Sequence, residues 1–236
     1  MTVVRLLALT VVGLLALSGT MTAQIGAAAS LSVNSQQITP YRSCTITATP
    51  SSTTAVTDAG VRQATATTNF GTSTTNSVSS AAAANQRIYV RFDLTQCNPT
   101  IPSAATVRLA TLRIYMSAVP AACRTIDIFR STATWTEAVI TWNNQPFGTT
   151  LNNPASGSRT GSFDVGTPAG CQNQAAGYIV GATVTSDVAA LASGTTNFGW
   201  MLRDDVEASA TTRTSTFSGK DLGTLAQAPQ LVITYT

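Results

Sequence analysis

Apolar and polar residues alternate along several short stretches of the chain. Over residues 87–94 every second residue is apolar, and the positions between them hold Arg87, Tyr89, Arg91 and Asp93. Because successive side chains of a β-strand point to opposite faces, this period predicts a half-buried strand. Residues 108–116 and 125–130 repeat the pattern, and residues 200–203 and 231–235 indicate further strands.

Turn-forming clusters separate these stretches. Asn and Pro residues recur at positions 98–99, 143–146 and 152–154, where they supply turn geometry at short spacing. Many short strands of this kind predict an all-β fold, an antiparallel, jelly-roll-like β-sandwich. One short helix is expected over residues 186–192, because Ser186 can cap it, Asp187 suits its first turn and Gly194 follows its end.

The N-terminus has the pattern of an export signal. Arg5 precedes an apolar run over residues 6–17, and Ala27 and Ala29 fit a small-residue cleavage site before Ser30. We predict a signal peptide at residues 1–29 and a mature protein that is secreted, extracellular or at the cell surface, with no membrane association after cleavage. An uncleaved anchor is the alternative, although the run is short for a bilayer span.

The next segment, residues 30–55, differs from the rest of the chain in its residue pattern and composition. It carries two short β-like pieces near Ile38 and Ile46 and a Ser/Thr-rich run at residues 51–54. We interpret it as an extra leading strand and linker. The β-sandwich domain is then expected to occupy residues 56–236.

The four cysteines lie far apart and form no C-x-x-C pair. In an exported chain this spacing favours two disulfides over a metal site. The four residues allow three pairings, and their spacing does not choose among them; they are Cys44, Cys97, Cys123 and Cys171.

Charge and composition exclude several functions. Only 10% of the residues are charged and the formal net charge is +3, so nucleic-acid binding is not expected. The chain has no histidine, which excludes Ser/His/Asp and Cys/His nucleophiles and His-ligated metal sites. Asp204, Asp205 and Glu207 lie close together, but no apolar surroundings indicate a glycosidase pair. We favour a solvated loop there over a Ca²⁺ site, and predict no catalysis and no required cofactor.

Several stretches together resemble the DNRLRE-domain proteins, exported β-sandwiches related to a carbohydrate-binding module family with alginate-binding members. The most specific stretch joins two Trp, a Glu and an Asn-Asn-x-Pro turn within residues 126–146. The matching stretches cover nearly all of the chain after residue 55; they are residues 61–73, 89–94, 105–116, 126–146, 184–191, 195–203 and 228–236. The resemblance implies a sandwich that binds polysaccharide.

The pentapeptide TTNFG occurs twice, at residues 67–71 and 195–199. Members of the resembled family often carry such a turn near the first strand and another before a late strand. Asn69 and Asn197 can bond nearby backbone, and the glycines accept the positive φ of a sharp corner. We therefore interpret TTNFG as architectural and not as a ligand motif.

The best candidate for ligand binding is the outward polar face of the predicted strands. It carries Arg87, Tyr89, Arg91, Arg113 and Tyr115, whose guanidinium groups can pair with uronate carboxylates and whose rings can lie against sugars. The alternative is a solvated or partner-covered face with Arg–Asp pairing across strands.

Other residues have two readings each. Trp135 and Trp142 can serve as sugar-stacking platforms, although we favour packing. Glu137 between them can orient a sugar, but we favour a carboxylate that bonds backbone or an Arg. Lys220, the sole lysine, is expected in a turn and not in an isopeptide bond.

Two functions follow from these observations. The first is a non-catalytic carbohydrate-binding module that acts on acidic cell-surface or matrix polysaccharide. The second is a structural subunit of an extracellular filament, sheath or matrix, in which residues 30–55 add a strand to a neighbouring copy and the chain self-associates.

Overall fold

The computed structural model describes residues 40–49, 53–169, 171 and 176–236, in which the chain forms eleven antiparallel strands and one α-helix, α1 (Thr185–Ala192). This confirms the all-β prediction. The expected signal peptide and the β-like piece near Ile38 lie outside the described residues. The strands are β1 (Arg42–Thr47), β2 (Val56–Arg62), β3 (Thr75–Ser80), β4 (Gln86–Phe92), β5 (Val107–Ala118), β6 (Arg124–Arg130), β7 (Gly161–Val165), β8 (Gly177–Thr183), β9 (Trp200–Asp204), β10 (Arg213–Ser218) and β11 (Gln230–Tyr235).

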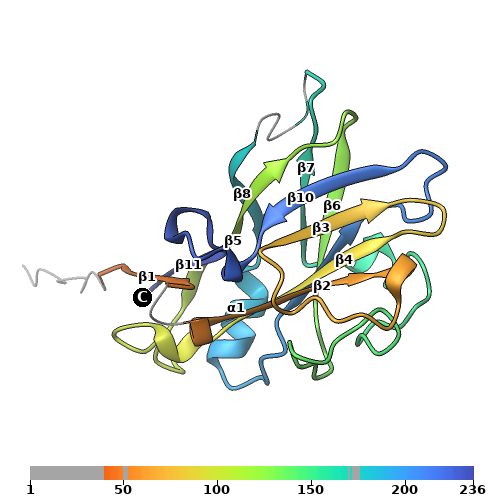
Figure 1. Cartoon of the computed structure of the whole chain (residues 1–236). Coiled ribbons are helices and arrows are strands. Elements are labelled where there is room, and N and C mark those ends of the chain that lie inside the picture. The colour runs from red at the N-terminus through yellow and green to blue at the C-terminus, as the bar shows by residue number, and fades with distance from the viewer. Residues whose placement is uncertain (1–39, 50–52, 170, 172–175) are drawn as a thin grey trace, which may run out of the picture. The chain divides into compact units, whose positions relative to one another are not determined.

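The strands form one curled sheet with the order β1-β11-β5-β10-β3-β4-β9-β6-β7 (Figure 1). Strand β2 adds to β4, and β8 adds to β5. The curl brings the part around β4, β9 and β6 to face the part around β11 and β5, because the buried side chains of both parts meet in one apolar cluster. All five strands predicted from the sequence are present, within two residues of the predicted bounds at each end.

Between the two parts of the sheet lies the inner core. It contains the alternating inward side chains of the strands, among them Val90 of β4, Leu112 of β5, Leu202 of β9 and Ile233 of β11. Burying each such side chain contributes about 1.5–3 kcal/mol to folding. The period-two pattern therefore identified the residues of this core correctly.

A second apolar cluster, the outer core, lies on the other face of β2, β4, β6 and β9. It is closed by the segment between β6 and β7, residues 131–160, which we call the β6–β7 segment. The outer core consists of Ala59, Val61, Tyr89, Phe129, Trp135, Ile140, Trp142 and Met201. The alternating pattern did not predict that this face would be covered.

Helix α1 begins at Thr185, one residue before the predicted start, and covers one end of the inner core through Val188 and Leu191. The expected Ser186 cap is wrong, because the N-cap residue is Val184 and no side chain caps the helix. Gly194 follows the helix with φ of +105°, as a glycine-terminated helix requires.

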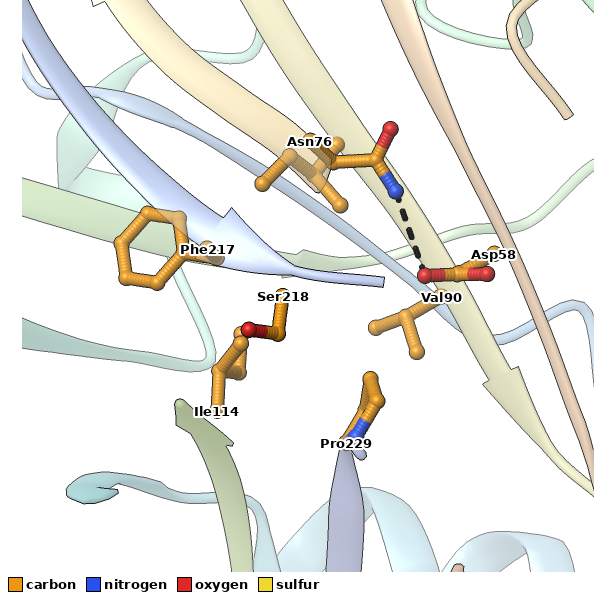
Figure 2. A pocket seen from close by; sticks show the side chains of 8 residues that line it. Asp58, Asn76, Val90, Ile114, Phe217, Ser218 and Pro229 are labelled. Carbon is orange, nitrogen blue, oxygen red and sulfur yellow. Dashed lines mark hydrogen bonds between the residues drawn. The ribbon is translucent and has the colours of Figure 1, made fainter. Parts of the chain in front are cut away.

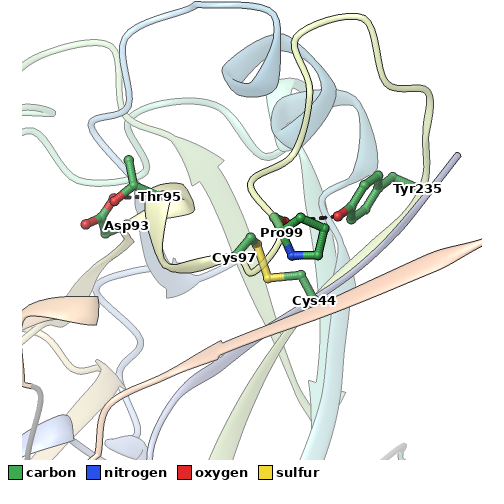
Figure 3. The surroundings of a disulfide bond; sticks show 6 residues. All are labelled: Cys44, Asp93, Thr95, Cys97, Pro99 and Tyr235. Atoms are coloured by element: carbon green, nitrogen blue, oxygen red, sulfur yellow. Dashed lines mark hydrogen bonds between the residues drawn. A yellow bond between two sulfur atoms is a disulfide. The ribbon is translucent and has the colours of Figure 1, made fainter.

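Two disulfides join Cys44 to Cys97 and Cys123 to Cys171, which confirms the prediction of two bridges and settles their pairing. Cys44 lies on β1, which pairs with β11 over its whole length. Figure 3 shows that the first bridge ties β1 to the turn before Pro99, whose carbonyl accepts a hydrogen bond from the Tyr235 hydroxyl. Residues 42–47, within the segment interpreted as a leading strand and linker, thus pair with the last strand of their own sheet.

The two TTNFG copies form matched corners. In each, the side-chain Oδ1 of the Asn accepts a hydrogen bond from the backbone amide of the Gly two residues later, at 3.1 Å for Asn69 and 3.0 Å for Asn197. Gly199 has φ of +72°, as predicted. The same prediction is wrong for Gly71, whose φ is not positive. Gly71 is required because a Cβ there would lie 2.2 Å from the Glu137 carbonyl oxygen. Both copies therefore form structural corners of the fold.

Candidate functional site

Arg87 and Tyr89 do not face solvent, so the prediction that they lie on an outward face is wrong. Both are 0% exposed, because the β6–β7 segment covers the face of β4 to which they point. The period-two pattern assigned them to the correct face of the strand but could not indicate that another segment lies over it. Burial also raises the pKa of the Tyr89 phenol above its ordinary value.

The Arg87 guanidinium is held inside the protein by a full set of partners. Its Nε lies 2.7 Å from Glu207 Oε1 and its Nη2 lies 2.8 Å from Glu207 Oε2. This bidentate ion pair is buried, because both side chains are 0% exposed. It also donates to the carbonyls of Gly148 and Thr150 and to Gln145 Oε1. Arg87 thereby fastens the β6–β7 segment to β4.

Both tryptophans of the specific sequence block pack in the outer core, which confirms the packing interpretation. Trp135 is 5% exposed and Trp142 is 3% exposed. The Trp135 indole donates to the Phe198 carbonyl at 2.7 Å, and its ring lies 5.6 Å from that of Tyr89. The Arg87 guanidinium carbon lies 4.7 Å from the centre of the Trp142 ring, within cation–π range.

The sequence suggested that the acidic group at residues 204–207 is a solvated loop, and this prediction is wrong. Asp204 and Glu207 are buried. Asp204 pairs with Arg124, which also lies 3.0 Å from Asp205, while Glu207 pairs with Arg87. The hydrogen bonds that Arg124 donates to Asp204 raise the pKa of Arg124 above its ordinary value. The carboxylate oxygens that we considered as calcium ligands are therefore paired with arginine side chains.

Arg91 is the member of the predicted face on β4 that remains half-exposed. Its side chain lines a surface hollow of about 290 Å³. The other residues of the hollow come from η1 (Thr53–Ala55), β2, the end of β4 and the second TTNFG corner; they are Thr54, Thr57, Phe92, Asp93 and Asn197. A guanidinium, a carboxylate and several hydroxyl or amide groups therefore share one concave surface.

A second hollow lies close to Arg91. The Arg91 guanidinium carbon lies 5.5 Å from the centre of the Trp135 ring, and Trp135 is among the residues that line this second hollow, of about 190 Å³. The second hollow is lined by the β6–β7 segment, through Thr134, Trp135, Thr136, Val139, Ile140 and Asn144. We call the two hollows and the Arg91–Trp135 contact between them the Arg91 groove.

Asp93 and Asn197 are held in fixed positions within the Arg91 groove. Asp93 accepts hydrogen bonds from the amide and hydroxyl of Thr95, at 3.0 Å and 2.7 Å, at the start of η3 (Leu94–Gln96). Burial opposes ionisation of Asp93, but these bonds outweigh it and hold the pKa of the carboxyl below its ordinary value. Asn197 donates to the Phe92 carbonyl at 2.7 Å. Two polar groups of the Arg91 groove are thus held in place by the protein itself.

Arg113 and Tyr115 lie elsewhere, on β5 in the opposite part of the curled sheet. Both are half-exposed and point away from the inner core. Their strand pairs with β11, which places Gln230 beside Arg113 and Val232 beside Thr111. The structure therefore separates the predicted face into three places: the outer core, the Arg91 groove and the outward face of β5.

Glu137 bonds backbone, as expected, but its charged partner is Lys220 and not an arginine. Its Oε1 accepts from the Asp58 amide at 3.3 Å and lies 3.1 Å from Lys220 Nζ. Lys220 lies in the short helical turn η5 (Lys220–Leu222), which confirms the turn prediction.

Burial is the main cause that raises the pKa of Asp58 to about 7.

A small interior cavity beside Asp58 is not a sugar site. Figure 2 shows it between Asp58, Asn76, Phe217 and Pro229, and its volume is about 10 Å³. That volume holds about one water molecule. A saccharide cannot enter a cavity of this size.

Sequence reasoning missed most of the Arg91 groove. Thr54, Thr57 and Asn197 belong to segments that carry no binding motif, and only the fold brings them beside Arg91. Asp58 was also missed, although a lone acid in the middle of a strand of small and apolar residues, VTDAGVR, is a usable signal.

Comparison with known proteins gives one family. Residues 49–235, well over half of the chain, match the model described as Carbohydrate-binding module family 96. No curated protein matches the chain. Among the residues that the structure describes, no helix is long and apolar enough to cross a membrane.

Proposed function

The chain belongs to carbohydrate-binding module family 96, and from that membership we propose that it is a non-catalytic module that binds acidic polysaccharide at a cell surface or in an extracellular matrix. The family match carries this proposal. The resemblance to DNRLRE-domain proteins points to the same class of function. The two disulfides are consistent with a secreted protein.

We place the sugar in the Arg91 groove. A guanidinium group can donate two parallel hydrogen bonds to a uronate carboxylate, and Arg91 is the half-exposed arginine that lines this surface. Threonine and asparagine side chains along both hollows match the hydroxyl groups of a sugar chain. The ring of Trp135 gives the groove an apolar wall.

The remaining predicted residues have supporting roles in this proposal. Arg87, Tyr89 and Trp142 hold the β6–β7 segment, and with it one wall of the groove, against the sheet. Arg113 and Tyr115 form a separate candidate surface on β5, to which the same sugar chemistry applies. The Arg91 groove is preferred because it is concave and has fixed polar groups.

The experiment is a binding measurement with the purified protein on immobilised polysaccharides. Retention on alginate or pectin, together with weak retention on neutral cellulose or starch, supports the proposal. Equal retention on all four, or none on any, contradicts the acidic specificity. Incubation with the same polysaccharides, followed by an assay for new reducing ends, tests the non-catalytic part; any turnover contradicts it.

The structural-subunit function stays the second candidate. Strand β1 lies at one end of the strand order, so a strand of a neighbouring copy can add to its outer edge. Gel filtration of the purified chain tests this. Polymers support strand addition between copies, whereas a monomer that binds alginate supports the first function alone.

A further inference from the structure

Four charged side chains meet at a place that the proposed sugar site does not use. Asp58 comes from β2, Glu137 from the β6–β7 segment, and Lys220 and Asp221 from η5. One carboxylate oxygen from each of the three acids can be chosen such that all three lie within 4.8 Å of one another. Three segments far apart in the sequence thus contribute oxygens to one point.

The group has more negative than positive charge. Lys220 Nζ lies 3.1 Å from Glu137 Oε1 and 3.1 Å from Asp221 Oδ1, so one ammonium group faces three carboxyl groups. The Lys220 side chain is 8% exposed, and those of Glu137 and Asp221 are 25% and 24% exposed. Carboxylates so close together and so little solvated favour a further cation.

A second observation concerns Asp58 itself, which is 2% exposed. Its Oδ2 accepts from the Asn76 side-chain amide and the Lys220 backbone amide, both at 3.2 Å. Its Oδ1 is buried and has no hydrogen-bond partner among the described residues. In Figure 2 this second oxygen points away from Asn76 and from the small apolar cavity. A buried carboxylate oxygen without a donor is costly unless a cation or a proton serves it.

From these two observations we propose that Asp58, Glu137 and Asp221 bind one Ca²⁺ ion. Calcium–oxygen distances of about 2.4 Å place any two ligands of one ion no more than about 4.8 Å apart, which the three oxygens satisfy. A site made only of oxygens suits a hard cation, and calcium accepts the irregular arrangement that loop residues provide. The three carboxylates leave further coordination positions, which water can fill.

Lys220 is the competitor of the ion. Its ammonium lies against two of the three ligands, so calcium binding requires this flexible side chain to swing away toward solvent. The bound ion then ties β2, the β6–β7 segment and η5 together through charge. The site depends on nothing in the proposed sugar function, and its test needs no polysaccharide.

The test is calorimetric titration of CaCl₂ into the full chain after treatment with a chelating resin. The unmodified protein should bind one ion, and Asp58→Asn and Asp221→Asn should each weaken binding by about tenfold or more through loss of a charged ligand. The matched control is Asp164→Asn, which removes an exposed acid outside the site and should leave calcium binding unchanged.

Lys220→Gln separates this proposal from a purely structural ion-pair group. Removing the competing ammonium should strengthen calcium binding, by about tenfold, because the carboxylates lose their internal counter-ion. The same variant should also show a larger rise of Tm with added calcium than the unmodified protein. Absence of calcium binding in both the unmodified chain and Lys220→Gln would overturn the proposal, as would unchanged binding by Asp58→Asn.

Discussion

The inner core and the outer core lie on opposite faces of β2, β4, β6 and β9, yet different forces hold them. The inner core consists of aliphatic and aromatic side chains from both parts of the sheet. The outer core adds the buried pair of Arg87 and Glu207 and the bound amide of Gln145. One face therefore relies on apolar burial, and the other on a charged anchor beneath a long irregular segment.

This difference explains where a binding groove can form. The inner core closes on itself and leaves a cavity of about 10 Å³ beside Asp58. On the outer-core side, the β6–β7 segment lines a hollow of about 190 Å³, and a hollow of about 290 Å³ lies beside Arg91 at the end of β4. The charged anchor thus fixes the wall of the proposed site.

The largest effect is expected when the charged anchor is broken. Arg87→Met should lower the free energy of unfolding by about 3–5 kcal/mol, because it leaves the buried Glu207 carboxylate without its partner. Urea unfolding measures the change. Arg108→Met, which changes an exposed arginine of β5, is the control and should cost little.

The double variant Arg87→Met with Glu207→Gln tests whether the unpaired Glu207 charge causes the loss of stability in Arg87→Met. It removes both charges, so much of the loss should be recovered. A double variant as unstable as the single one would show that packing, and not the charge pair, holds the β6–β7 segment.

The second effect concerns the inner core. Leu112→Ala should destabilise the protein by about 2–5 kcal/mol, since Leu112 is 0% exposed and its removal leaves a cavity. In a Trp200→Phe background, which removes the inner-core tryptophan, the near-ultraviolet signal of Trp135 and Trp142 should persist in folded Leu112→Ala, whereas Arg87→Met should alter it. Loss of that signal in folded Leu112→Ala would contradict the separation of the two cores.

The sequence predicted the inner core well because apolar burial leaves a period of two in the residues themselves. Val90 and Leu112 were assigned to the inward face, and both are buried there. The outer core could not be predicted in the same way. Arg87 and Tyr89 alternate like exposed residues, and their burial depends on a segment that begins more than forty residues later.

The candidate site was predicted only in part for a related reason. Arg91 was identified from the strand pattern, and Trp135 from the specific block. Thr57 and Asn197 join them through the pairing of β2 with β4 and through the second corner, contacts that no local pattern records. Short motifs therefore indicated the chemistry, and the fold selected which residues share a surface.

A smaller effect is expected at the two TTNFG corners. Asn69 donates two hydrogen bonds to the β6–β7 segment, at 2.7 Å and 2.8 Å, whereas Asn197 donates one, to the Phe92 carbonyl. Asn69→Ala should thus cost about 1–3 kcal/mol, and more than Asn197→Ala at about 1 kcal/mol. Thermal unfolding of both variants measures the difference. Equal costs would show that the corners do not differ in what they anchor.

The smallest effect on stability, and the most direct test of function, is expected at Arg91. Titration of an alginate oligosaccharide into the unmodified protein, Arg91→Ala and Arg113→Ala compares the groove with the outward face of β5. We expect Arg91→Ala to weaken binding by about tenfold or more with little change in Tm, while Arg113→Ala binds normally. Normal binding by Arg91→Ala would contradict the assignment of the sugar to the Arg91 groove.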